Sequence, residues 1–116
     1  MRNLNGKNCV LTGAASGIGR AMAHGLAREG MNLCLVDLDM EGLEKVKGEI
    51  EPAGAVKMLS RTDVANPEEV NKLAEESWQQ FGAVDLLINN AGIAGAGLVE
   101  ELEPDDWKNV LDVNLW

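Results

Sequence analysis

The sequence contains no tyrosine, a single phenylalanine and a single histidine, so side chains that transfer protons near neutral pH are scarce. No spacing of cysteine and histidine is typical of a metal site, and we expect His24 to be structural. The two cysteines, Cys9 and Cys34, fall in apolar runs that we expect to be buried strands, where cysteine acts as a small hydrophobic residue. These strands are expected to be neighbours, with both thiols reduced. We therefore predict neither a metal site nor a disulfide.

Long hydrophobic runs and positive charge are also in short supply. No extended apolar stretch follows Met1, so we expect neither a signal peptide nor a transmembrane helix. The 10 Lys and Arg residues are outnumbered by 19 Asp and Glu residues, which gives a formal net charge of −9. This balance argues against nucleic acid and anionic membranes as partners, and we expect a soluble, cytoplasmic protein.

What the sequence does contain is a regular alternation of apolar patterns. With 46% hydrophobic residues in 116, the chain can bury the core of one domain. Short apolar runs predict strands, and segments with a period of 3.6 residues predict helices between them. The strands are expected at residues 7–12, 33–36, 55–59 and 84–88, and the helices at 17–29, 40–51 and from Pro67 to Gly82, with a last helix opened by Pro104.

This order of elements indicates an α/β fold with a parallel sheet and right-handed crossovers. The expected strand order is 3-2-1-4, the first half of a doubly wound, Rossmann-type sheet that is truncated in its fourth helix. A glycine-containing loop would follow residues 84–88, which would be left as an apolar edge strand. We therefore expect residues 1–116 to be one incomplete domain of a longer protein.

The first strand runs into the glycine-rich turn Thr12-Gly13-Ala14-Ala15-Ser16-Gly17-Ile18-Gly19 and then into a helix. Gly13 permits a tight turn, Gly17 leaves room for a ligand, and Gly19 lets the helix pack close to the strand. Backbone N–H groups of such a turn, together with the helix N-terminus, favour a pyrophosphate. A strand–helix turn without a ligand is the alternative.

Two residues of this turn and two residues after the second strand complete a predicted dinucleotide site. Ser16 and Ile18 are candidates for hydrogen bonds to phosphate and ribose. Asp37 could accept hydrogen bonds from both ribose hydroxyls of an adenosine, and it would repel a 2′-phosphate. No Lys or Arg stands in the turn before Gly17 or directly after Asp37, so the sequence predicts NAD rather than NADP. Leu38 is the expected apolar wall for the adenine, whereas Asp39 is an ordinary loop acid or a helix cap.

Two motifs together resemble one family. The segment from Thr12 to Gly19 resembles the TGxxxGxG fingerprint of the short-chain dehydrogenase/reductase family, and Asn89-Asn90-Ala91-Gly92 is similar to its NNAG element. The resemblance covers the whole chain and corresponds to roughly the first half of a typical member. It implies that Asp63 hydrogen-bonds the adenine amino group and that the Val64 backbone fixes the ring. Without the family, Asp63 would be an unremarkable loop acid.

The NNAG element follows the fourth predicted strand, at the edge of an open α/β sheet where ligands bind. The small side chains of this segment allow close approach of the cofactor's ribose to Asn90, Ala91 and Gly92. Asn89 is expected to tie the sheet together rather than touch a ligand.

Asn114 stands at helical spacing from Trp107, Val110 and Leu111, which places an amide on an apolar helix face. It either ties this helix to the sheet or, as the resemblance implies, belongs to a catalytic tetrad with a Ser, a Tyr and a Lys, where it helps to hold a water in a proton relay. The tyrosine and lysine of that tetrad form a Tyr-x-x-x-Lys motif. Because these 116 residues contain no tyrosine, they cannot assemble the tetrad by themselves.

The resemblance implies an NAD-dependent oxidoreductase that transfers hydride between nicotinamide and a small alcohol or carbonyl substrate. It also implies a dimer or tetramer, since members of the family usually form one. Two other interpretations stay open. The chain could be a nucleotide-binding module without catalysis, or a truncated folding fragment without a ligand.

Overall fold

A computed structural model describes residues 3–50, 55–90 and 99–100. The elements are β1 (Asn8–Thr12), α1 (Gly17–Arg28), β2 (Asn32–Asp37), α2 (Met40–Ile50), β3 (Val56–Arg61), α3 (Pro67–Phe81), β4 (Leu86–Ile88) and β5 (Val99–Glu100). The predicted alternation of strands and helices is confirmed as far as β4. The predicted loop that contains the glycines at positions 92, 95 and 97 lies outside the described residues, and so does the predicted helix from residue 104.

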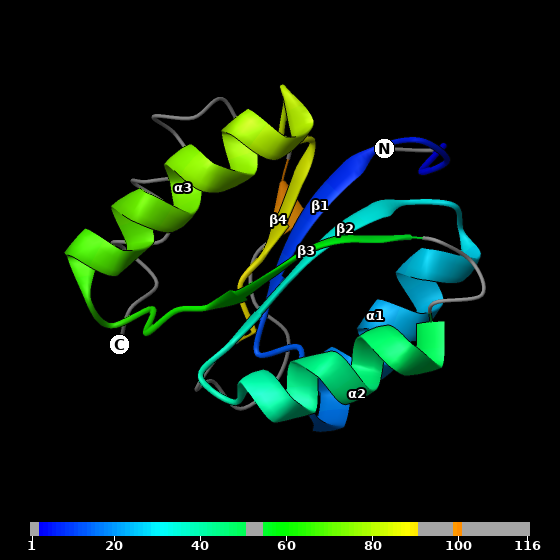
Figure 1. The fold of residues 1–116 in the computed structure, drawn as a ribbon. Helices are drawn as coiled ribbons and strands as arrows, with labels where there is room; N and C mark the ends of the chain where they lie inside the picture. The colour runs from blue at the N-terminus through cyan, green and yellow to red at the C-terminus, as the bar shows by residue number, and fades with distance from the viewer. Residues whose placement is uncertain (1–2, 51–54, 91–98, 101–116) are drawn as a thin grey trace.

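The strands form a single sheet in the order β3-β2-β1-β4-β5, which confirms the predicted order of the first four (Figure 1). β1 pairs in parallel with β2 and β4, and β2 pairs in parallel with β3. The expectation that the fourth strand forms the edge is wrong, because β5 pairs with β4 in antiparallel fashion. A short apolar strand with unpaired N–H and C=O groups readily templates a further strand, and here a later segment of the same chain supplies it.

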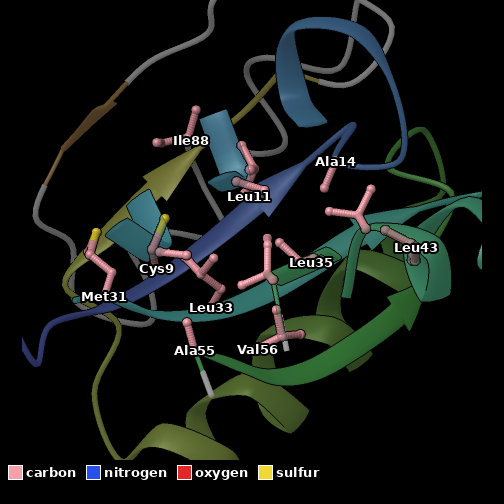
Figure 2. Close-up of a cluster of buried hydrophobic side chains, with 14 of the residues drawn as sticks. Cys9, Leu11, Ala14, Met31, Leu33, Leu35, Leu43, Ala55, Val56 and Ile88 are labelled. Carbon is pink, nitrogen blue, oxygen red and sulfur yellow. The ribbon is translucent and has the colours of Figure 1, made fainter. Parts of the chain in front are cut away.

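Helices cover both faces of the sheet, with α1 and α2 on one face and α3 on the other (Figure 1). Successive residues of a strand point to opposite faces, so Leu11 packs in the α1–α2 layer and its neighbour Val10 packs in the α3 layer. Figure 2 shows how Leu33, Leu35 and Val56 of neighbouring strands gather in the first of these layers. Strands buried on both faces explain the continuous apolar runs in the sequence.

The same alternation separates the two cysteines. Cys9 belongs to the α1–α2 layer and Cys34 to the α3 layer, although β1 and β2 are neighbours. Both thiols are free and fully buried, and burial raises the pKa of each to about 12. The expectation of two reduced, structural cysteines on neighbouring strands is confirmed.

The start and end of α3 follow the sequence signals. The side chain of Asn66 accepts hydrogen bonds from the N–H groups of Glu68 and Glu69, at 3.0 and 3.3 Å. Pro67 occupies the first helical position, where its missing N–H costs nothing. Gly82 ends the helix in the left-handed region, at φ 75°, and its N–H donates to the carbonyl of Trp78.

β3 is longer than the apolar pattern predicted. It continues through Ser60 and Arg61 because these residues keep their parallel pairing with Val36 and Asp37 of β2. The loop that follows β3 therefore begins directly beside the end of β2, where Thr62 N donates to the main-chain oxygen of Asp37 at 3.3 Å.

Candidate dinucleotide site

The glycine turn after β1 has the backbone conformation that its sequence predicts. Gly13 and Gly17 have φ of 65° and 57°, a region that other residues rarely adopt. At Gly19 the constraint is spatial, because a Cβ there would lie 1.8 Å from the carbonyl oxygen of Gly13. α1 therefore begins in contact with the turn, and its first N–H groups lie at the carboxyl edge of the sheet.

The space around this helix start is open. A Cβ at Gly17 would meet nothing within 4 Å. Ser16 is the N-cap residue of α1 with an extended backbone, and its side chain makes no capping hydrogen bond. Ile18 and Leu38 are the large apolar residues that stay exposed in the described part of the chain, at 55% and 51%. Both of them belong to the predicted dinucleotide site.

Asp37 connects the end of β2 to the glycine turn. One carboxylate oxygen accepts a hydrogen bond from Ala15 N and the other from Asp39 N, each at 3.1 Å. Asp39 in turn accepts from Gly42 N at 3.0 Å, so it caps α2, one of the two roles left open for it. The Asp37 side chain thus joins the glycine turn to the end of β2.

Between β1 and β4, a buried hydroxyl joins the turn to the NNAG segment. Thr12 Oγ1 donates to Asn89 Oδ1 at 3.0 Å and accepts from Asn90 N at 2.9 Å. Asn90 Nδ2 reaches the carbonyl oxygen of Gly13 at 3.5 Å. Thr12 and Asn89 are fully buried, so Asn89 ties the sheet together. Sequence reasoning assigned no role to Thr12, although its position directly before Gly13 was a usable signal.

The loop after β3 carries Asp63 and Val64. Asp63 Oδ1 accepts a hydrogen bond from Ala65 N at 2.9 Å, which makes a local turn. Val64 is partly buried against the α3 layer of the core. The side chain of Val64 therefore anchors the loop, while Asp63 stays at the same edge of the sheet as Asp37.

The structure brings most of the predicted site residues to one edge, formed by the carboxyl ends of β1 to β4. Ala91, Gly92 and Asn114 lie outside the described residues. Within the described ranges, His, Cys, Asp and Glu side chains form no group of three or more that could hold a metal ion. No helix of the described part combines the length and the apolar character needed to cross a membrane.

The fold, the glycine turn and the NNAG segment together define a dinucleotide-binding class of α/β protein. The family model of the short chain dehydrogenases matches residues 7–116, and the chain belongs to the short-chain dehydrogenase/reductase family. The "CLA biosynthesis dehydrogenase/reductase" of Lactiplantibacillus plantarum is 39% identical over 115 residues. That match covers 99% of this chain and 40% of the relative, so the chain spans less than half of the relative's length.

Solved structures of the family agree. A short-chain dehydrogenase/reductase from Burkholderia phymatum in complex with NAD is 43% identical, with a TM-score of 0.70 over 75% of this chain and 31% of that one. An NAD⁺-bound xylitol dehydrogenase is 37% identical, with a TM-score of 0.75 over 81% of this chain and 36% of that one. These neighbours have the same fold, and both hold NAD.

Proposed function

We propose that the carboxyl edge of this sheet binds NAD(H) and that the whole protein is an NAD-dependent oxidoreductase acting on a small alcohol or carbonyl substrate. The observation that carries the proposal is the Asp37 carboxylate, which lies hydrogen-bonded to the glycine turn at the end of β2. A carboxylate at this point favours a ribose with free hydroxyls and repels a 2′-phosphate. The NAD-bound relatives support the choice of cofactor.

Each residue has a separate proposed role along the dinucleotide. The N–H groups after Gly17, with Ser16 and Ile18, would hold the pyrophosphate and its ribose. Asp37 would bind the adenosine ribose. The adenine would lie against Leu38, near the Val64 backbone, with its amino group on Asp63. The small NNAG residues Asn90, Ala91 and Gly92 would face the ribose at the other end.

The residues present fit such a ligand. A Cβ at Gly17 would have open space around it. Ile18 and Leu38 expose apolar side chains at the same edge of the sheet, and a ligand that covered them would remove this apolar surface from water. When bound, NAD supplies hydride-transfer chemistry between its nicotinamide and a carbonyl or alcohol carbon. The part of this chain in that chemistry is to bind and orient the cofactor.

Catalysis needs more than these 116 residues contain. We propose that Asn114 supports a proton relay with a Ser and a Tyr-x-x-x-Lys motif, and the sequence holds no tyrosine. Because the sequence has no tyrosine, a nucleotide-binding module without turnover is the second candidate function. We further propose that residues 1–116 are an incomplete single domain of a cytoplasmic protein that works as a dimer or tetramer, as is usual in the family.

The test is a calorimetric titration of the purified protein with NAD and, separately, with NADP. We expect NAD to bind more tightly. Asp37→Asn should weaken the binding of NAD by roughly tenfold, the scale of one hydrogen bond to a charged group. The same substitution should reduce the difference between the affinities for NAD and NADP.

Glu41→Gln, which removes the same charge from an exposed position in the first turn of α2, is the control and should bind like the wild type. Equal affinity of the wild type for NAD and NADP, or no loss in Asp37→Asn, would contradict the proposed role of Asp37.

A further inference from the structure

One side chain in the first turn of α3 reaches back to the loop that carries Asp63. Glu69 Oε1 accepts a hydrogen bond from Asp63 N at 2.9 Å, in a partly buried position. The main-chain N–H of Glu69 donates to Asn66 Oδ1 at 3.3 Å. Both ends of Glu69 are therefore fixed, and its side chain ties the loop to the helix.

This contact differs from ordinary helix capping. In a capping box, the carboxylate three residues after the N-cap accepts from the N–H of the N-cap residue itself. Here that residue is Asn66, and its N–H donates instead to the main-chain oxygen of Asp63 at 2.9 Å. Glu69 bypasses Asn66 and holds Asp63, so the contact serves the loop as well as the helix start.

Asp63 is consequently held at three points. Its N–H is bound by Glu69, its main-chain oxygen by Asn66, and its Oδ1 by the N–H of Ala65. Among the described residues, Asp63 Oδ2 accepts no hydrogen bond. Of the three tethers, only the one to Glu69 uses a side chain that can be changed without altering Asp63 or the N-cap.

We propose that Glu69 is a positioning residue that holds the Asp63 main chain so that the second carboxylate oxygen of Asp63 faces the adenine of a bound dinucleotide. The inference rests on the proposed function, because it assumes that Asp63 contacts adenine. A fixed acceptor loses less conformational entropy on binding than a mobile one, so removal of the tether weakens binding. The lost affinity concerns the contacts with the adenosine half of the ligand.

The experiment compares the affinities of NAD and AMP for the wild type and for Glu69→Ala, with melting followed in parallel. Because AMP contains only the adenosine half, Glu69→Ala should reduce the affinities for NAD and for AMP by the same factor, roughly three- to tenfold. Glu69→Gln keeps an oxygen acceptor and should restore most of the affinity. Glu75→Ala removes an equal charge from an exposed position further along the same helix, where the side chain makes no hydrogen bond among the described residues, and should leave both affinities unchanged.

A lower melting temperature with unchanged affinities in Glu69→Ala would show a purely structural role and overturn the inference. Glu69→Asp keeps the charge but shortens the side chain, so it gives the same test if the alanine variant does not fold. Glu69→Asp should also weaken the binding of both ligands, and wild-type affinities in this variant would overturn the inference. If the wild type itself binds neither NAD nor AMP, the proposed function fails and takes this inference with it.

Discussion

At the scale of single residues, two glycines on helices have opposite surroundings. A methyl group at Gly19 would meet the carbonyl oxygen of Gly13 and, at 2.9 Å, Asn90 Nδ2, whereas one at Gly48 would meet nothing within 4 Å. In Gly19→Ala, α1 must move away from the turn. This substitution should therefore destabilise the protein by about 1–3 kcal/mol and weaken the binding of NAD at least tenfold. Gly48→Ala should stabilise it by about 0.5–1 kcal/mol, since alanine favours helix.

Urea unfolding gives both free energies, and NAD titration gives both affinities. The two variants carry the same chemical change, so each serves as the control for the other. Equal effects on NAD affinity would contradict the close approach of α1 to the turn.

Residue roles could be predicted where one element carries the signal, as at Pro67 and Gly82, which begin and end α3. They could not where the partner comes from elsewhere in the chain. The bond from Ala15 N to Asp37 joins residues 22 positions apart, and the one from Asn90 N to Thr12 joins residues 78 positions apart. Periodicity and propensity describe neighbours along one element, so such contacts appear only when the sheet is assembled.

At the scale of elements, Glu49 of α2 links the outer faces of α1 and α2. Arg20 Nε donates to Glu49 Oε1 at 2.9 Å, Arg20 also binds the other carboxylate oxygen, and His24 Nε2 lies 2.8 Å from Oε1. The hydrogen bonds from Arg20 and then from His24 lower the pKa of Glu49 to about 2, from an ordinary value of 4.5. A depressed pKa means that the unfolded chain binds the proton first, so this contribution to stability is present above pH 4.5 and is lost as the pH falls toward 2.

We therefore expect Glu49→Gln to lower the melting temperature at pH 7 by a few degrees at most, because the pair is exposed. The difference from the wild type should shrink between pH 4.5 and 2, and also in 1 M salt. Glu44→Gln, on an exposed part of the same helix, is the control and should show neither trend. A pH-independent difference in Glu49→Gln would mean that the lost contacts, not the charge, determine the effect.

The sequence predicted the elements up to β4 because strong apolar periods define them. It missed β5, a strand of two residues, Val99 and Glu100. So short a strand has no period of its own, and its pairing depends on the open side of β4. β3 was predicted too short for a related reason, since Ser60 and Arg61 are polar and only their pairing with β2 makes them strand.

At the scale of the whole molecule, the two buried thiols report separately on the two layers of the core. Cys9 lies under α1 and α2, and Cys34 lies under α3. With pKa values raised to about 12 by burial, neither thiol forms a reactive thiolate in the folded protein near pH 8. A thiol reagent should therefore label them only when the layer above opens.

Because NAD is proposed to bind only the folded form, it should slow the labelling of both cysteines. At a concentration 100 times its dissociation constant, the ligand lowers the open population roughly 100-fold. Cys9→Ala and Cys34→Ala leave one reporter each, and equal slowing in both would show that the sheet and its two helix layers open as one unit. Nicotinamide mononucleotide, which lacks the adenosine half, is the control ligand and should slow labelling much less. Labelling that NAD does not change would instead favour the folding fragment without a ligand, and fast labelling of Cys34 alone would show that α3 separates first.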